Sequence, residues 1–319
     1  MRDFYVDDLL TGTNTVEEAR KQKTELIQLL SAAGMNVRKW ASNNPYVFEE
    51  LNNSDLERMI QTDKDPKTLG LLWAPAADEL RYSVQQTPNP SITKRTILST
   101  IAQIFHPLGL VGPAVIRAKI ILQNLRQLKL GWDETLPQNL YTTWKEFHSH
   151  LRALNEITVP RFVLGANIVT VQLHGFSGAS TVAYGTCIYL RSSDSVGNHN
   201  VRLLCTKSQV APLKQINWPR LELQAALVLA HLSETVSAAL SVEIKEKYFW
   251  SDSTITLGWI LSYPTRWPTS VANRTSEMQR LTNDNWNHFL SGENPADLIS
   301  REINPEDLHD QELWWMGPD

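Results

Sequence analysis

Carboxylates whose type and spacing could do chemistry stand in two regions of the sequence, and the first is close to the N-terminus. Tyr5-Val6-Asp7-Asp8 places two adjacent aspartates in a short β-prone run that Leu9 continues, a pattern that predicts a hairpin with an acidic turn. Two adjacent carboxylates on such a turn can hold divalent cations beside a polynucleotide terminus. Aspartate is also a favoured turn residue, so a solvated turn explains the pair at least as well.

Three more acids stand at expected strand and helix ends in the C-terminal half. Glu222 follows Pro219 in what should be the first turn of a helix, where a negative charge suits the helix dipole. Asp252 precedes the next expected helix and could cap it. Asp297 follows Pro295 and could occupy the third position of a short helix. Each acid alone therefore has a structural interpretation beside a metal-binding one.

A basic stripe is the third candidate. Lys119, Arg126 and Lys129 fall within about 80° of one another on the wheel of a helix expected over roughly 113–130. The stripe could face nucleic-acid phosphates. A solvated helix face is the more common explanation of such a charge run.

The elements that must position these side chains change in character along the chain. Residues 1–90 mix short strands with a helix over 15–34, which Thr15 opens and Gly34 closes. A polar stretch at 83–91 predicts a linker, and the following part to residue 160 is helical, with helices over 93–105 and 113–130.

The third part, 161–303, begins with three β-rich runs, and a helix over 219–240 and a strand over 242–250 follow. A helix, a further helix and a further strand complete the order. Three hairpin-linked strands followed by βαβ units predict a mixed sheet with helices on its faces, an α/β fold with α+β portions. A polar tail, 304–319, ends the chain.

Composition excludes several classes of protein. The hydrophobic share is 42% and the charged share 20%, as in a soluble globular protein rather than a disordered one. No apolar run approaches the roughly 20 residues of a membrane helix. The N-terminus lacks a secretory h-region, so we expect an intracellular protein, cytoplasmic or nuclear, without a membrane partner. A net charge of −4 excludes a globally basic nucleic-acid binder but not a local basic groove.

The flanking sequences of the acids resemble the Pao/BEL family of long-terminal-repeat retrotransposon polyproteins across nearly the whole chain. The matching segments occur in the family's order: FYVDDLLTGTNTVEEA, GMNVRKWASN, TKRTILSTIAQIFHPLGLVGPAVIRAKIILQ, LHGFSGAS, PRLELQAA, FWSDSTI, VANRTSEMQ, ENPADLISR and LWWMGPD. The resemblance implies four parts: a reverse-transcriptase palm and thumb remnant over 1–90, a helical connection over 91–160, an RNase H-like domain over 161–303, and a linker over 304–319 towards an absent integrase.

The resemblance also implies roles for the acids. In the RNase H fold, four carboxylates hold two Mg²⁺ ions, for which Mn²⁺ can substitute. Glu222, Asp252 and Asp297 match the second, third and fourth acids. The first acid belongs to the H-G-F-S-D-A-S pattern of the opening strand, and here that position is Gly178. Glycine has no side chain that could bind a cation, and His174, four positions earlier, is a poor magnesium ligand.

The palm site is incomplete in a different way. Asp7 and Asp8 match its metal-binding pair, but the site needs a further aspartate on an upstream strand, and only four residues precede Tyr5. The resemblance therefore predicts a catalytically impaired fragment of a reverse transcriptase–RNase H, whose missing polyprotein portions are possible partners.

Three interpretations of present activity stay open: a decayed fragment without function, an adopted non-catalytic protein that binds RNA–DNA hybrid or single-stranded nucleic acid, and a weakly active Mg²⁺-dependent ribonuclease H. Gly178 argues against the third, and the acidic net charge argues mildly against the second.

Overall fold

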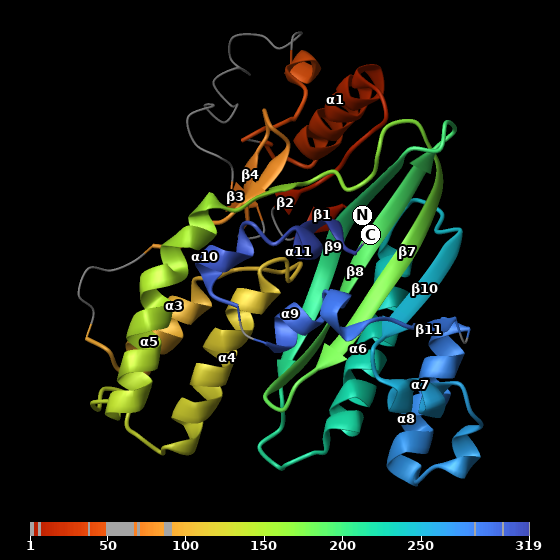
Figure 1. The fold of residues 1–319 in the computed structure, drawn as a ribbon. Helices are drawn as coiled ribbons and strands as arrows, with labels where there is room; N and C mark the ends of the chain where they lie inside the picture. The colour runs from red at the N-terminus through yellow and green to blue at the C-terminus, as the bar shows by residue number, and fades with distance from the viewer. Residues whose placement is uncertain are drawn as a thin grey trace. The chain divides into compact units, whose positions relative to one another are not determined.

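The computed structural model describes residues 3–5, 8–37, 39–48, 67–68, 71–85, 91–283, 285–301 and 303–318. They form two compact units, one of residues 1–82 with 158–162 and one of residues 83–157 with 163–319 (Figure 1). The four-part division expected from the sequence stays a prediction. Within the described part of the chain, no helix is both long and apolar enough to cross a membrane.

The first unit contains the expected hairpin, in which Phe4 pairs with Leu9 and Tyr5 with Asp8. Val6 and Asp7 lie outside the described residues. The unit also has a four-stranded antiparallel sheet in the order β3-β4-β5-β6. Its elements are β1 (Phe4–Tyr5), β2 (Asp8–Leu9), α1 (Val16–Ala32), η1 (Pro45–Phe48), β3 (Lys67–Thr68), β4 (Leu71–Ala74), β5 (Glu79–Arg81) and β6 (Thr158–Pro160).

Helix α1 follows its sequence signals closely. The Thr15 hydroxyl accepts a hydrogen bond from the Glu18 amide at 3.2 Å, which caps the N-terminus. Gly34, with a φ of +75°, ends the helix in the left-handed conformation that glycine adopts without a steric penalty. The predicted helix over 15–34 is confirmed.

The second unit is built on a five-stranded mixed sheet in the order β11-β10-β7-β8-β9. Strand β8 is antiparallel to its two neighbours β7 and β9, whereas β10 runs parallel to both β7 and β11. Their bounds are β7 (Ile168–Ala179), β8 (Ala183–Asp194), β9 (His199–Val210), β10 (Glu246–Ser251) and β11 (Trp286–His288).

Helices cover both faces of this sheet. The α-helices are α3 (Lys94–Ala102), α4 (Gly112–Gln127), α5 (Gln138–His150), α6 (Trp218–Ala239), α7 (Thr254–Ile260), α8 (Thr269–Thr282), α9 (Asp297–Ser300), α10 (Pro305–Leu308) and α11 (Glu312–Met316). Short 3₁₀ turns are η2 (Leu151–Glu156), η3 (Pro264–Arg266) and η4 (Ser291–Glu293).

Residue parity along β7 shows which helix covers which face. A side chain at Gly175 would collide with Leu229 of α6, at 2.5 Å, so the glycine allows the helix to approach. Gly178, of opposite parity, faces Ala296 and Asp297 beside α9. Figure 1 shows α9 and α11 in front of the sheet and α6 behind it. The main core lies between the sheet and α6, with α8 packed on α6.

The predicted order of the third part is confirmed: three strands, helix, strand, two helices and a strand. The sheet is mixed and carries helices on both faces, as expected. The tail, interpreted as a linker, is part of the second unit: Trp314 of α11 is fully buried, and its indole N–H donates to the Leu110 carbonyl at 2.8 Å.

Candidate active site

Two neighbouring parallel strands end at the same edge of the sheet, and their ends position the candidate site. Ser177 of β7 and Ser251 of β10 form the last pair of the ladder, and the Ser177 hydroxyl donates to the Trp250 carbonyl at 3.3 Å. The next residues are Gly178 and Asp252. The carboxyl ends of parallel strands are where ligands bind in open α/β sheets.

Glu222 comes to this edge from α6, whose N-terminus Asn217 caps through its side chain. Because the helix begins at Trp218, Glu222 lies beyond its first turn, and the expectation that Glu222 is a first-turn acid was wrong. One carboxylate oxygen, Oε1, accepts from the Ala179 amide at 3.1 Å and from the Trp218 indole at 3.0 Å. The side chain is only 5% exposed, and Oε2 has no hydrogen-bond partner among the described residues.

Asp252 stands between β10 and α7, and it does not cap the helix. Ser253 is the N-cap, because its hydroxyl accepts from the Thr256 amide at 3.2 Å. The capping interpretation of Asp252 was therefore wrong. Its Oδ1 is buried and has no hydrogen-bond partner within the described part of the chain. The acid is free of the structural role that the sequence allowed.

Asp297 is the first residue of α9, with Ala296 at the N-cap, so it is not the third residue of a helix begun by Pro295. Its Oδ2 accepts from the Arg301 guanidinium at 2.6 Å. The buried Asn294 fixes the preceding loop to the sheet, since its amide donates to the Ser177 carbonyl at 3.0 Å.

Gly178 brings the α9 loop close to the end of β7. A Cβ at this position would lie 2.9 Å from Oδ1 of Asp297 and 3.4 Å from Ala296. Contacts under 3.0 Å require something to move, here the end of an aspartate side chain. Asp297 thus extends into the space beside Gly178.

Burial and the charge of Asp252 raise the pKa values of Glu222 and Asp297. Burial, reinforced by the charge of Asp252, raises the pKa of Glu222 to about 8. The pKa of Asp297 rises to about 6, again chiefly through burial, although the ion pair with Arg301 opposes the rise. Interacting carboxylates with raised pKa values are a common feature of functional sites.

The donor chemistry fits a divalent cation in part. Glu222 and Asp252 each offer a buried carboxylate oxygen without a partner, and such oxygens suit Mg²⁺ or Mn²⁺. Across the described residues, however, no group of three His, Cys, Asp or Glu side chains is placed to hold a metal ion. The fit is to a cation held by two carboxylates and water, not to the complete four-acid set.

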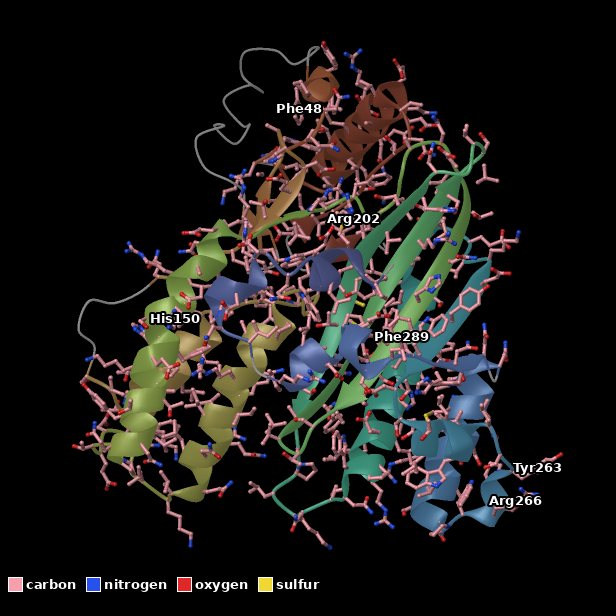
Figure 2. All side chains as sticks on the ribbon, viewed as in Figure 1. Phe48, His150, Arg202, Tyr263, Arg266 and Phe289 are labelled. Carbon is pink, nitrogen blue, oxygen red and sulfur yellow. The ribbon has the colours of Figure 1, made fainter. Side chains whose placement is uncertain are left out.

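Beside the acids, aromatic rings cover β7 and β10. His174 stacks on Tyr248 with ring centres 5.0 Å apart, and Phe176 stacks on Trp250 at 6.2 Å. Phe289, labelled in Figure 2, packs edge-on against Trp250 at 5.6 Å. Burial lowers the pKa of His174 to about 4, so the imidazole is a neutral member of this stack.

The remaining predicted site residues lie elsewhere. Asp8 is exposed on β2, and its neighbour Asp7 lies outside the described residues. Lys119 turns inward, and its ammonium donates to the Ser208 hydroxyl and carbonyl, both at 3.0 Å, which ties α4 to β9. Arg126 and Lys129 are exposed. The three cations of the expected stripe therefore do not share one surface.

Sequence reasoning missed two side chains that position the acids. Trp218 holds Glu222 through Oε1, and the same indole N–H is 3.0 Å from the Ala179 carbonyl. Arg301 holds Asp297. Both residues adjoin or lie within the motifs quoted above, PRLELQAA and ENPADLISR, but an indole donor and a surface arginine carry no signal of their role in the sequence alone.

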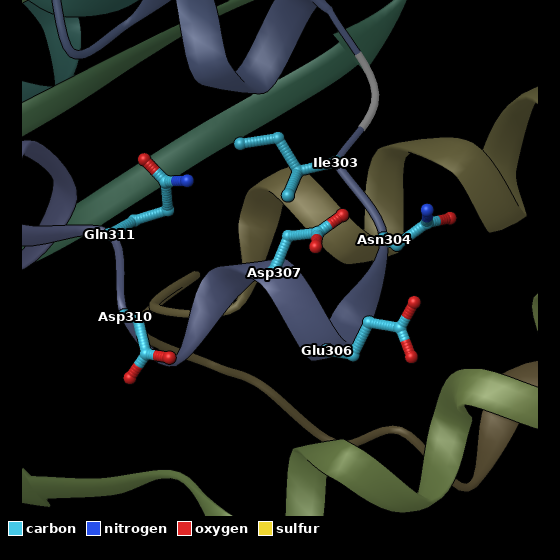
Figure 3. Close-up of a pocket in the computed structure, with 6 residues that line it drawn as sticks. All are labelled: Ile303, Asn304, Glu306, Asp307, Asp310 and Gln311. Atoms are coloured by element: carbon cyan, nitrogen blue, oxygen red, sulfur yellow. The ribbon is translucent and has the colours of Figure 1, made fainter.

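A pocket of about 460 Å³ lies farther along the chain, around α10 (Figure 3). Its lining includes Glu306, Asp307 and Asp310. Two of these acids already form hydrogen bonds to histidine rings: Glu306 bonds to His150 and Asp310 to His309, both at 2.6 Å. None of the candidate catalytic acids lines this pocket.

A family model described as the Pao retrotransposon-like RNaseH-like domain matches residues 93–253, just over half of the chain. The chain belongs to this family. The match includes Gly178, Glu222 and Asp252 and ends before Asp297. The five-stranded mixed sheet and its helices agree with an RNase H-like fold.

A search of curated proteins finds no match. Among solved structures, RNase H1 from Halobacterium salinarum is 10% identical and aligns over 42% of this chain and 96% of its own, with a TM-score of 0.28. LC11-RNase H1, isolated from compost and solved in complex with RNA/DNA hybrid, is 16% identical to this chain. The alignment covers 44% of this chain and 99% of LC11-RNase H1, also with a TM-score of 0.28.

The foamy viral protease-reverse transcriptase in complex with dsDNA is 17% identical, with 87% of this chain and 52% of that one aligned and a TM-score of 0.24. The chain thus spans about half the length of that protein. Likenesses at these scores support no functional conclusion.

Proposed function

We propose that this protein is a retroelement RNase H-like domain that binds RNA–DNA hybrid at the β7–β10 edge and cleaves its RNA strand poorly. The observation that carries the proposal is the convergence of Glu222, Asp252 and Asp297 around a glycine. Three separate elements bring the acids together, and their charges act on one another. A buried cluster of like charges is costly unless a cation or a proton compensates it.

Cleavage should be impaired because Gly178 stands where the four-acid set needs another carboxylate. When bound, a pair of divalent cations activates water and stabilises the leaving oxygen in phosphodiester hydrolysis. The acid matched by Gly178 is the one that both ions share in the family, and a glycine cannot replace it. Asp297 is in addition engaged by Arg301. The chain's own residues can therefore hold and orient a cation, but the shared ligand is missing.

Binding and cleavage assays on the full chain test the proposal. We expect the hybrid to bind in Mg²⁺ more tightly than duplex DNA of the same sequence, with an affinity that falls as salt rises because phosphate contacts release counterions. Cleavage should be at or near background. Rapid cleavage that Asp252→Asn abolishes would favour the active-ribonuclease alternative, and absence of any hybrid preference would favour the decayed fragment.

We also propose that the first unit derives from a reverse-transcriptase palm and that residues 1–319 by themselves, with Asp7 and Asp8 as the acids matched to the palm site, do not extend a primer. The β1–β2 hairpin at FYVDD supports the derivation, since its register places Tyr5 opposite Asp8. Two carboxylates cannot replace a three-carboxylate site. Primer extension with Mg²⁺ or Mn²⁺ should not exceed a no-protein control; extension that disappears in Asp7→Asn would contradict this.

A further inference from the structure

The three acids at the β7–β10 edge are not equivalent. Glu222 and Asp252 each retain a buried oxygen without a hydrogen-bond partner in the described part of the chain. Asp297 instead forms a 2.6 Å ion pair with Arg301, four residues later. A fixed positive charge thus already stands beside one acid, while the other two have no such compensation.

We propose that this site takes one divalent cation, held by Glu222 and Asp252, and that the guanidinium of Arg301 occupies the role of a second cation at Asp297. The inference deepens the proposed function by assigning the number of ions and the ligands of the one that binds. It concerns this chain's departure from the four-acid arrangement rather than that arrangement itself.

The unpartnered oxygens favour the Glu222–Asp252 side. A buried acceptor without a partner costs about 1–3 kcal/mol, and a bound cation removes that cost from two oxygens at once. Oε1 of Glu222 is already fixed by the Ala179 amide and the Trp218 indole. Because one oxygen is anchored and the other is unpartnered, the carboxylate is preorganised to bind a cation through Oε2.

Arg301 and Gly178 together disfavour a second ion. The guanidinium stays charged at any working pH and bonds to a carboxylate oxygen that a cation would need. Gly178 supplies no bridging oxygen, and Asp297 Oδ1 lies only 2.9 Å from where its side chain would begin. The place for a second ion thus lacks its shared ligand, and its remaining acid is already paired with a guanidinium of the chain.

Titration of the full-length chain with Mn²⁺, without nucleic acid, tests how many divalent cations each chain binds. Calorimetry should give one site per chain. Glu222→Gln and Asp252→Asn should each weaken it at least tenfold, whereas Asp297→Asn should change the affinity less than threefold. Asp307→Asn, an exposed acid in α10, is the matched control and should bind like the parent. Two ions in the parent, none, or dependence on Asp297 instead of Glu222 would overturn the proposal.

Arg301 variants test the guanidinium directly. Arg301→Gln leaves Asp297 uncompensated and should tighten Mn²⁺ binding about fivefold or more, and Arg301→Lys should return it to the parent value. A merely structural role for Arg301 would weaken binding in the glutamine variant, and that result, or no change, would refute its role as a built-in cation. Circular dichroism verifies the fold of each variant.

Hybrid binding, measured separately on the same samples, distinguishes this inference from the proposed function. One Mn²⁺ per chain without hybrid binding would contradict the function and leave the ion count intact. Hybrid binding by a chain that takes two ions, or none, would support the proposed function and contradict the ion count.

Discussion

The two acidic regions of this molecule differ in what surrounds them. Asp8 lies exposed on a two-residue strand, in a hairpin with a single short partner. Glu222 is 5% exposed and reaches the ends of long strands that pair on both sides. The same functional group is exposed on a short strand in one place and, in the other, is buried with a raised pKa. Burial by tertiary structure, not the carboxylate itself, makes the difference.

The sharpest way to test the buried region is to restore its missing acid. Gly178→Asp must displace Asp297 Oδ1, which weakens the ion pair with Arg301 and opens a place for a second cation. We expect Mg²⁺-dependent cleavage of hybrid RNA to rise about a thousandfold, or ~4 kcal/mol in the barrier.

Asp252→Asn in the Gly178→Asp background should return cleavage to the parent level. Gly12→Asp, where an added side chain meets nothing within 4 Å, is the control for an extra surface charge. If the parent cleaves as fast as Gly178→Asp, the glycine is not a lesion; if Gly178→Asp folds but stays inert, further decay lies elsewhere in the domain.

The second test uses pH. Because the pKa of Glu222 is raised from 4.5 to about 8 in the folded chain, the native state binds the proton more tightly than the unfolded state. This contribution to stability is complete below pH 4.5 and is lost as pH rises towards 8. In EDTA we expect the free energy of unfolding of the parent, measured relative to Glu222→Gln, to fall on the order of 5 kcal/mol across that window.

Chemical denaturation between pH 5 and 9 measures that fall. Subtracting the Glu222→Gln profile from the parent profile isolates this carboxyl from His106 and His174, whose lowered pKa values of about 4 make stability rise with pH, and from Asp297. Asp8→Asn should leave the parent profile unchanged. A difference between parent and Glu222→Gln that does not decline over this range would show that the carboxyl titrates normally.

Trp218→Phe should have a smaller effect. The substitution removes the indole N–H that bonds to Glu222 Oε1, and we expect a loss of about 1–2 kcal/mol in the free energy of unfolding. The loss should be larger at pH 9 than at pH 5, because the bond is stronger to the ionised carboxylate. Trp132→Phe, at another exposed tryptophan, is the matched comparison; equal losses in both variants at both pH values would refute the role of Trp218.

The exposed region should show the smallest effect of all. Asp8→Asn is expected to change the free energy of unfolding by less than about 0.5 kcal/mol, as surface substitutions usually do. Urea denaturation followed by tryptophan fluorescence provides the measurement. A change above 1 kcal/mol would mean that Asp8 has a stabilising partner in the folded protein and that the surroundings of Asp8 and Glu222 differ less than proposed.

The sequence by itself predicted the order of elements over residues 161–303 and drew attention to Glu222, Asp252 and Asp297 as candidate acids. The β-rich runs that form β7–β9, the alternation in β10 and the helical spacing in α1 are local properties of the chain, so they can be detected without a fold. The sheet β3-β4-β5-β6 was not predicted, because its strands are only two to four residues long and β6 joins from far along the chain.

Only the tertiary structure decided where the acids lie and which groups they contact. The ladder register places Gly178 and Asp252 at one edge, and the α9 loop brings Asp297 into the space beside the glycine. The structure also assigned the cap to Ser253 rather than Asp252 and turned Lys119 inward to Ser208. Such contacts depend on positions of a few tenths of an ångström between segments distant in sequence, whereas local patterns specify only which face a side chain occupies.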